Sequence, residues 1–293
     1  MTQRPVNLMD NPYADRVKRV ARLAGRSAVR NRRQQFLAEG PQSATEAIRA
    51  HLGLLKLSEP AQQMWPIGET VAEVYYTQRL ATSHPDLFAL VQQLPAHVFV
   101  AETSDQVLQS MSDAVVHQGI VAVVNMPSNN FQPSPRADLV AGIVRVQDPG
   151  NVGTIIRVAD ASGADYALAT PGTVDIYNPK TVRSTAGSLF HLPVYPRVEI
   201  GAFVASFQGR IFAADGYGTR VLDQTDPGML NEPTAWLFGN EGQGLNDHEL
   251  RLADQRVAVP LYGLAESLNV ATAATICLYS SAMAQRRYEP LTS

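Results

Sequence analysis

The sequence predicts an α/β protein in which a small N-terminal α/β domain precedes a larger domain with a parallel sheet. Short apolar segments of strand type alternate with amphipathic helical segments along most of the 293 residues. Strand segments in the second half are apolar at nearly every position, which is typical of parallel strands covered by helices on both faces. Loops rich in Gly, Asn and Pro follow three of them, where open α/β sheets bind ligands.

The composition limits the class of protein. A hydrophobic content of 45% and a charged content of 17% are typical of a globular chain that can bury a core. No apolar run approaches the roughly 18 residues that span a bilayer, and the segment after Met1 does not resemble a secretory signal. The single cysteine, Cys277, excludes an internal disulfide or a multi-cysteine zinc site. We therefore expect a cytoplasmic protein without membrane contact or metal.

The N-terminal segment is strongly basic in an otherwise acidic chain. From Arg4 to Arg33, nine basic residues stand against two acidic ones, although the net charge of the whole chain is −3. This asymmetry is typical of a protein that contacts phosphates. The segment therefore predicts a nucleic-acid partner, with Arg30, Arg32 and Arg33 among the contacts.

The first portion of the chain predicts a small alternating domain. Asn11 and Pro12 suit the start of a helix that ends at Gly25, and Ser43 suits the cap of a second helix with Glu46 at its capping-box position. The sequence predicts strands within 34–41, 71–76, 97–101 and 119–124, and further helices at 85–94 and from residue 104.

A proline-rich stretch follows this portion. Residues 125–135 contain three prolines and little hydrophobic pattern, as expected of a linker. We therefore predict an N-terminal domain at 1–125, a linker at 126–137 and a second domain at 138–293. In the second domain, strands are predicted at 139–146, 166–170, 210–214, 234–238 and 257–259. Helices are predicted at 154–162, 178–188, 199–208 and 246–253, with a long last helix from about residue 269.

Three loops after strands carry the polar residues of a candidate site. The first, 148–157, contains two glycines, Asn151 in a position to cap the following helix, and Arg157 within that helix. The second, Gly239-Asn-Glu-Gly-Gln-Gly244, is of the type that serves phosphates or an adenosine group, although it lacks the order G-x-G-x-x-G and the lysine of a P-loop. The third passes through Ser267 and Asn269 into the last helix.

Together these loops resemble the motifs of one enzyme family. Asn151 with Arg157, residues 239–244 and Ser267-Leu-Asn269 are similar in order and spacing to motifs 1, 2 and 3 of the SpoU (TrmH-like, SPOUT superfamily) RNA ribose methyltransferases. Residues 185–193 resemble the segment between motifs 1 and 2, and the resemblance extends over 139–287. Residues 36–48 and 118–124 are similar to the N-terminal substrate-binding domain of that family.

The resemblance implies a deep trefoil knot in the C-terminal domain, a homodimer and S-adenosylmethionine as the cofactor. It also implies that the N-terminal domain binds RNA, with Arg183 of the second domain as a further contact. The predicted cofactor-binding residues lie in the loops of motifs 2 and 3, and they are Gly239, Asn240, Gly242, Gly244, Val259, Leu261, Leu268 and Asn269.

The implied reaction is an in-line displacement of the methyl group from the sulfonium by a ribose 2′-oxygen. A hydroxyl is a poor nucleophile, so side chains must orient it. Because an arginine stays protonated at ordinary pH, we expect Arg157 to orient the hydroxyl or a flanking phosphate. Of the remaining predicted catalytic residues, Ser267 and Asn269 would hold Arg157 or the nucleotide, and Asn151 would shape its loop. Glu241 would accept a hydrogen bond from the loop, with a role as base as the alternative.

Other functions remain open at this point. A nicotinamide or flavin enzyme could use a similar sheet, but the dinucleotide motif is missing. An RNA-binding protein with a decayed catalytic domain and a methyltransferase of a base nitrogen are further alternatives, which the intact motif residues disfavour. The domain before the linker favours 23S ribosomal RNA as the substrate, since family members that modify transfer RNA tend to carry only short extensions. A transfer RNA 2′-O-methyltransferase is the alternative.

Overall fold

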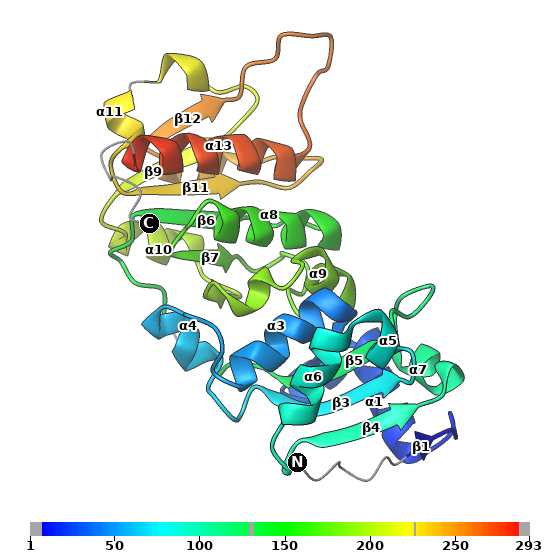
Figure 1. Ribbon diagram of the computed structural model, residues 1–293. Coiled ribbons are helices and arrows are strands. Elements are labelled where there is room, and N and C mark those ends of the chain that lie inside the picture. Colours follow the sequence, from blue (N-terminus) through cyan, green and yellow to red (C-terminus); the bar gives the residue numbers. More distant parts are fainter. Residues whose placement is uncertain (1–7, 129–131, 226, 287–293) are drawn as a thin grey trace. The chain divides into compact units, whose positions relative to one another are not determined.

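The computed structural model describes residues 8–128, 132–225 and 227–286, and these residues form two compact units (Figure 1). The first unit lies within Met1–Asn129 and Asp175–His191, and the second lies within Asn130–Val174 and Leu192–Ser293. Arg4 of the basic segment and Arg287 at the end of the resemblance lie outside the described residues. No described helix is long and apolar enough to cross a lipid bilayer.

The first unit contains a five-stranded mixed sheet in the order β1-β4-β3-β5-β2. β5 runs antiparallel to both of its neighbours, and the other pairs are parallel. The strands are β1 (Leu8–Met9), β2 (Gln35–Glu39), β3 (Val71–Thr77), β4 (Phe99–Thr103) and β5 (Ile120–Asn125). The helices are α1 (Asp15–Gly25), α2 (Ser27–Arg33), α3 (Pro41–His51), α4 (Glu59–Met64), α5 (Leu80–Ser83), α6 (Pro85–Gln93), α7 (Asp105–Met111), α9 (Pro179–Ser184) and the 3₁₀ turn η1 (Ser188–Phe190).

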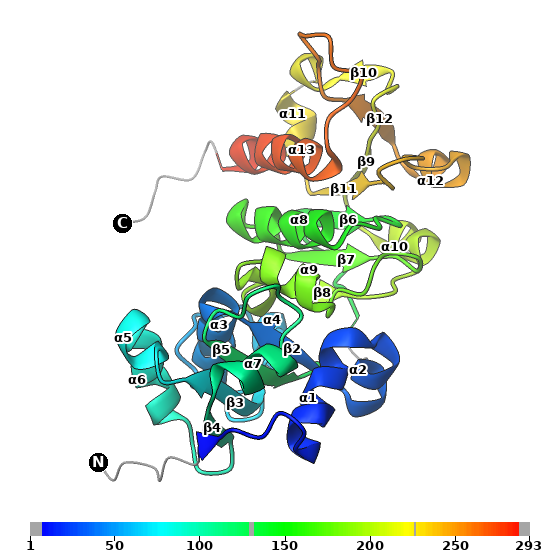
Figure 2. The same cartoon turned by 90° about the vertical axis from the view of Figure 1, so that its right-hand side faces the viewer.

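Both faces of this sheet are covered, and successive side chains of its strands point alternately into two apolar cores. In β2, Leu37 packs with Val20 of α1 and Leu108 of α7 in one apolar cluster. The neighbouring Phe36 points to the opposite face, where its ring lies 4.9 Å from that of Tyr177 and 6.2 Å from that of Trp65. Figure 2 shows α1 and α3 on opposite sides of the sheet.

Two predicted helix starts are wrong in detail. α1 begins at Asp15, because Asn11 first forms a turn in which its side chain accepts from Tyr13 N at 2.9 Å. α3 begins at Pro41, so Ser43 lies inside the helix, buried, and does not cap it. A proline has no N–H to satisfy and has a helical φ, which favours the earlier start.

Residues 175–191 belong to the first unit, whereas the sequence placed them in an uninterrupted second domain. This segment supplies part of the aromatic core, since the ring of Phe190 lies 4.9 Å from that of Trp65. Trp65 also donates its ring N–H to Leu189 O at 3.1 Å. Three polar contacts hold the start, middle and end of the segment: the ion pairs Arg30–Asp175 and Glu39–Arg183, both at 2.6 Å, and a contact of 3.0 Å between Glu46 and His191.

The second unit is built on seven parallel strands in the order β10-β12-β9-β11-β6-β7-β8, which confirms the predicted parallel sheet. The strands are β6 (Leu139–Ile143), β7 (Tyr166–Ala169), β8 (Val194–Tyr195), β9 (Arg210–Ala214), β10 (Arg220–Val221), β11 (Thr234–Phe238) and β12 (Gln255–Ala258). The helices are α8 (Pro149–Ala161), α10 (Ile200–Ser206), α11 (Pro227–Leu230), α12 (Asp247–Leu252), α13 (Val270–Gln285) and the 3₁₀ turn η2 (Leu222–Gln224).

Helices cover both faces of the parallel sheet, with α8 and α13 on one side and α10 and α12 on the other (Figure 2). Every residue of β6 and β11 is buried, as the apolar runs predicted. Trp236 of β11 fixes α13 to the sheet by donating its ring N–H to Ser281 Oγ at 2.9 Å. Because all seven strands are parallel, the loops that follow β6, β9, β11 and β12 emerge at the same edge.

Candidate active site

The first candidate loop leads from β6 into α8. Asp148, rather than the predicted Asn151, caps this helix, since its Oδ1 accepts from Asn151 N at 2.9 Å. α8 therefore begins at Pro149, about one turn before the predicted start at residue 154. This earlier start places Asn151 in the first helical turn and leaves its side chain free to reach the other loops.

A chain of side-chain hydrogen bonds joins the three candidate loops. Asn269 donates from Nδ2 to Asn151 Oδ1 at 2.9 Å, and Asn151 donates from Nδ2 to Glu241 Oε1 at 3.0 Å. Asn269 also caps α13, because its Oδ1 accepts from Ala271 N at 2.8 Å. Three predicted catalytic residues from separate parts of the sequence thus meet at one edge of the sheet.

Glu241 acts as the acceptor for the loop after β6. Its carboxylate accepts from Gln147 N at 3.1 Å and Asp148 N at 3.0 Å, in addition to the amide of Asn151. Partial burial favours the neutral acid, but these hydrogen bonds outweigh burial and lower the pKa of Glu241. A carboxylate with a lowered pKa is a weak base, so the contacts fit the expected role of holding a loop.

The glycine-rich loop after β11 closes tightly on itself. Asn240 and Gly244 exchange backbone hydrogen bonds of 3.2 and 2.8 Å, and Asn240 Oδ1 accepts from Gly242 N at 3.0 Å. A Cβ on Gly239 would lie 2.4 Å from the carbonyl carbon of Gly244, so only glycine fits there. By contrast, a Cβ on Gly242 would meet nothing closer than 3.6 Å.

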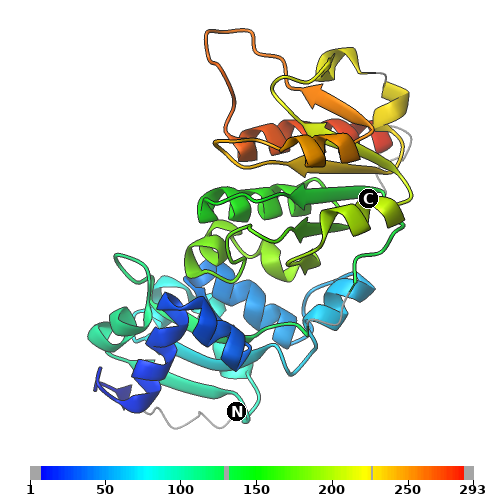
Figure 3. The ribbon, with the colours of Figure 1, turned by 180° about the vertical axis from the view of Figure 1, so that it is seen from behind.

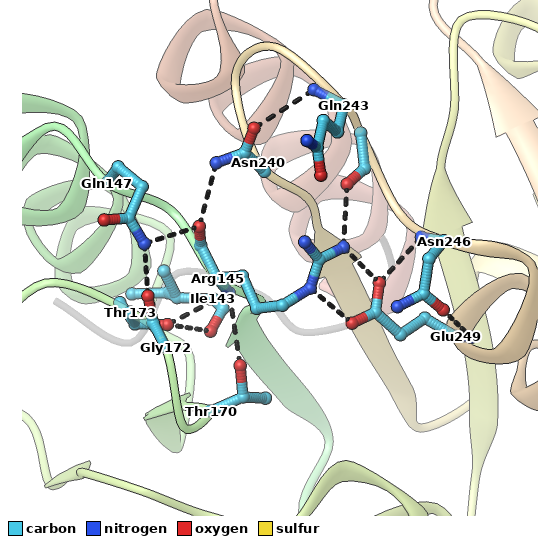
Figure 4. Close-up of polar contacts among 11 residues, drawn as sticks. Ile143, Arg145, Gln147, Thr170, Gly172, Thr173, Asn240, Gln243, Asn246 and Glu249 are labelled. Carbon is cyan, nitrogen blue, oxygen red and sulfur yellow. Dashed lines mark hydrogen bonds and ion pairs between the residues drawn. The ribbon is translucent and has the colours of Figure 1, made fainter.

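Arg145 is a site residue that the sequence did not indicate (Figure 4). It follows β6 in the left-handed region, with φ of 55°. Its guanidinium donates to both carboxylate oxygens of Glu249 at 2.7 and 2.8 Å and to Gly244 O at 3.2 Å. Its carbonyl accepts from Asn240 Nδ2 at 3.1 Å. Arg145 therefore connects the loop after β6 to both ends of the glycine-rich loop.

A cavity of about 590 Å³ lies among the loops that follow β9, β11 and β12. The loop between β12 and α13, drawn in orange, projects away from the sheet (Figures 1 and 3). Every predicted cofactor-binding residue except Gly242 lines the cavity, as does Ser267. The sequence missed the contribution of the loop after β9, where Asp215, Gly216 and Gly218 line the wall. The Asp-Gly pair directly after a strand could have indicated it.

The cavity is suited to a ligand that carries both apolar and cationic groups. The apolar residues Val257, Leu261 and Leu268 line part of it. Asp215 on the same wall is already paired with Arg256 at 2.6 Å, so Glu266 is the lining carboxylate that can stabilise a nearby positive charge. S-adenosylmethionine combines an adenine ring with a sulfonium and an ammonium group, so the lining fits this cofactor.

Arg157 does not belong to this cavity. Its side chain is exposed on α8, and it makes no hydrogen bond or ion pair with another residue in the described part of the chain. The contacts of the second unit therefore do not test its expected catalytic role.

The four predicted RNA contacts differ in their surroundings. Arg30 is 3% exposed and donates to Asp175 at 2.6 Å and to Leu23 O at 2.8 Å, so the prediction that it binds RNA is wrong. Its guanidinium is a buried structural group. Arg183 is engaged with Glu39 and lies 3.3 Å from Asp113. Arg32 and Arg33 are exposed at the end of α2, and their RNA contacts stay predictions.

No group of three or more His, Cys, Asp or Glu side chains among the residues in the described ranges could hold a metal ion. Cys277 is buried, and burial raises the pKa of its thiol.

Two sequence models of known families match the chain. Residues 138–279 match the SpoU rRNA methylase family, and residues 67–129 match the RNA 2′-O ribose methyltransferase substrate-binding domain. The 23S rRNA (guanosine(2553)-2′-O)-methyltransferase RlmP of Bacillus subtilis is 38% identical over 178 residues, which cover 60% of this chain and 69% of that protein. The chain belongs to the SpoU family.

A second SpoU relative is the 23S rRNA (uridine(2479)-2′-O)-methyltransferase of Streptomyces viridochromogenes. It is 37% identical over 172 residues, which cover 55% of this chain and 59% of that protein. This match therefore spans less than two thirds of that relative.

Solved structures of SpoU proteins resemble both parts of the chain. The SpoU methyltransferase AviRb of Streptomyces viridochromogenes, in complex with the cofactor AdoMet, is 27% identical, with a TM-score of 0.75 over 94% of this chain and 100% of that one. An RNA 2′-O ribose methyltransferase gives a TM-score of 0.74 at 28% identity, over 96% of this chain and 100% of that one. These similarities confirm the predicted SpoU family and α/β fold class.

Proposed function

We propose that this protein methylates a ribose 2′-hydroxyl of 23S ribosomal RNA with S-adenosylmethionine as the methyl donor. The observation that carries the proposal is the hydrogen-bonded chain Asn269–Asn151–Glu241, two members of which line the 590 Å³ cavity. It unites the three family motifs around one ligand-sized space. The names of the two 23S rRNA-modifying relatives support the choice of RNA.

The cavity residues have two roles in this proposal. The backbones of 239–244 and 259–268 bind the cofactor, which supplies an electrophilic methyl group on a positively charged sulfur when bound. Glu266 stabilises a positive charge of the cofactor from the wall of the cavity. Arg145 and Glu241 hold the two loops in place, so that little reorganisation is needed when the cofactor and RNA bind.

The RNA side of the reaction depends on polar side chains of the first and third motifs. Arg157 orients the 2′-hydroxyl or a flanking phosphate, since its exposed guanidinium has donors to offer. Ser267 and Asn269 hold the nucleotide or Arg157 at the mouth of the cavity. The N-terminal domain, predicted at 1–125, binds the RNA, with Arg32, Arg33 and Arg183 as proposed contacts.

Two further features of the family belong to this proposal. The C-terminal segment, which includes the loop after β12 and α13, is threaded through another loop and forms the trefoil knot. Two copies of the chain form a homodimer that completes the active site. Ile276, Tyr279 and Met283 support the homodimer, because they place an apolar stripe on the exposed face of α13, at 36%, 38% and 57% exposure. The cytoplasmic location and the absence of a metal stay predictions.

The test is transfer of labelled methyl from S-adenosylmethionine to unmodified ribosomal and transfer RNA, followed by nucleoside mass analysis. A 2′-O-methylated nucleoside in the 23S fraction is the expected result. Label in transfer RNA would select the alternative substrate, and label on a base nitrogen would contradict the reaction. Cofactor binding without any transfer would support a decayed enzyme.

A further inference from the structure

The first unit contains a second cavity, of about 550 Å³, that the proposed methyl transfer does not use. It lies where β3 ends, where β5 begins and where α3 starts. Its polar lining includes Gln42, Thr77, Arg79, His84, His117 and Gln118, and no carboxylate is among the lining residues in the described part of the chain. In a chain with a net charge of −3, a cavity lined by Arg79, two histidines and no carboxylate is suited to an anion.

The unpartnered hydroxyl of Thr77 indicates that this cavity binds a ligand. The residue is 3% exposed, and its hydroxyl is buried without a hydrogen-bond partner among the residues that the structure describes. A buried hydroxyl without a partner is unfavourable, and such groups in native proteins usually have a reason. A ligand oxygen that accepts from Thr77 Oγ1 would satisfy it.

The start of α3 supplies further donors. This 11-residue helix begins after Gly40, which has φ of 84° and no side chain to cap the first turn. Pro41 and Gln42 of the first turn line the cavity. Free backbone N–H groups and the positive end of the helix dipole favour a phosphate at such a position.

Asp105 lies outside the lining but holds two of the basic groups. Its carboxylate pairs with Arg79 at 3.1 Å and His117 at 3.3 Å. The side chains of Arg79 and Asp105 are 79% and 51% exposed, and exposed pairs of this kind are weak. Asp105 therefore keeps Arg79 beside the cavity without preventing its guanidinium from donating to an anion.

We infer that this cavity binds a backbone phosphate of the RNA substrate. The inference rests on the proposed function for the identity of the RNA. The hydroxyl of Thr77, the N-terminus of α3 and the guanidinium of Arg79 share the phosphate oxygens. An RNA strand is favoured over a small phosphate compound, because the exposed Arg79 leaves one side of the site open for a continuous chain to pass.

The test compares three variants of the full-length protein for binding to an unmethylated 23S rRNA transcript over a series of salt concentrations. Thr77→Val should weaken binding roughly tenfold, because it removes one hydrogen bond to a charged group while keeping the shape. Arg79→Gln should weaken binding by a similar factor and reduce the salt slope by about 1. Lys56→Gln removes an exposed charge of the same unit outside the cavity and should change affinity less than about twofold.

Further measurements separate this site from folding and from the methyl transfer. Thr77→Val should melt no lower than the unchanged protein without RNA, because it removes an unpartnered hydroxyl, and all three variants should keep their affinity for S-adenosylmethionine. RNA affinity of Thr77→Val and Arg79→Gln equal to that of Lys56→Gln would overturn the inference. The inference would also be overturned if inorganic phosphate bound through Thr77 while the substitutions left RNA affinity unchanged. A transcript that binds but is never methylated would contradict only the proposed function.

Discussion

Arg145 and Glu249, 104 residues apart in the sequence, form a two-point ion pair at the glycine-rich loop (Figure 4). Glu249 is 6% exposed at its side chain, and Arg145 is 27% exposed. The pair holds Arg145 in a left-handed conformation that costs a non-glycine residue of the order of 1–3 kcal/mol. Arg145 in turn donates to Gly244 O and accepts from Asn240, so the pair determines where the loop lies.

Removing the charge of Glu249 should therefore destabilise the second unit. Glu249→Gln is expected to lower the free energy of unfolding by about 1–3 kcal/mol at pH 7, because the charged Arg145 loses its partner. Chemical denaturation measures the change. Asp247→Asn removes an exposed carboxylate from the same helical turn and should change the free energy by no more than about 0.5 kcal/mol. Equal effects of the two variants would contradict the role of the pair.

The same pair predicts a dependence of stability on pH. Burial favours the neutral form of Glu249, but hydrogen bonds from Arg145 and Asn246 N outweigh burial and lower the pKa of the carboxyl. The stabilisation is therefore complete above the unfolded pKa of about 4.3 and is lost as the pH falls through the folded pKa. The stability difference between the protein and Glu249→Gln should be constant from pH 7 to about 5 and shrink below. A difference that grows in acid would exclude this explanation.

The glycine-rich loop offers a matched pair of substitutions. Gly239→Ala places a methyl group 2.4 Å from backbone, so the loop must shift and the affinity for S-adenosylmethionine should fall at least about tenfold. Gly242→Ala meets only the Asn240 side chain at 3.6 Å and should bind the cofactor almost as tightly as the unchanged protein. Isothermal titration calorimetry measures both. Similar losses in the two variants would show that loop flexibility, rather than close approach, is what the glycines supply.

The contact between Asn151 and Glu241 predicts a shift of the pH dependence of activity. Asn151→Asp replaces a donor with a second carboxylate about 3.0 Å from Glu241, and turnover at pH 7.5 should fall on the order of 10²-fold. Because neighbouring carboxylates raise the pKa of one another, the variant should regain part of its relative activity as the pH falls. Asn151→Ala lacks the repulsion and should not regain it. If the two variants have pH profiles of the same shape, repulsion between the carboxylates does not explain the loss of activity.

Arg157 should affect turnover and not cofactor binding. Arg157→Ala is expected to keep the affinity for S-adenosylmethionine, since Arg157 does not line the cavity, and to lose on the order of 10²-fold in turnover. Arg157→Lys keeps the charge but not the planar fork of donors, so it should restore little activity. Calorimetry and single-turnover methyl transfer measure the two quantities. An equal loss of cofactor binding would assign Arg157 to the cofactor.

Arg30 should contribute to folding stability, whereas Arg32 and Arg33 should contribute to RNA binding. Arg30→Ala leaves Asp175 without its partner and removes buried hydrogen bonds, so it should lower the free energy of unfolding of the first unit by about 3–5 kcal/mol. Arg32→Ala and Arg33→Ala should leave stability within about 0.5 kcal/mol and flatten the salt dependence of RNA binding. Thermal denaturation and filter binding measure the two effects. A stable Arg30→Ala protein with weak RNA binding would restore the prediction from the sequence.

The strands of the second unit and the local chemistry of the loops were predictable from the sequence. Runs such as 235–238 are apolar at every position because helices cover both faces of the parallel sheet, and this burial leaves a clear pattern. Asn269 and Asn246 were predicted at helix starts, and both cap a helix, since capping depends on a side chain and the next few residues. The start of α8 was misplaced because Asp148 and Asn151 are both suitable caps, and Pro149 favours the first.

The sequence by itself determined the α/β class, the family motifs and two of the loops that line the 590 Å³ cavity, because these depend on short-range patterns. Only the tertiary structure decided which partners those residues have. Arg30 is a buried structural group and not a surface contact, because Asp175 lies 145 residues away in the chain and beside it in space. Arg145 likewise pairs with Glu249, which is distant in the chain and adjacent in space. Residues 175–191 pack in the first unit because their partners also lie far away in the sequence. Long-range pairing of charges and rings is decided by packing, which no local pattern records.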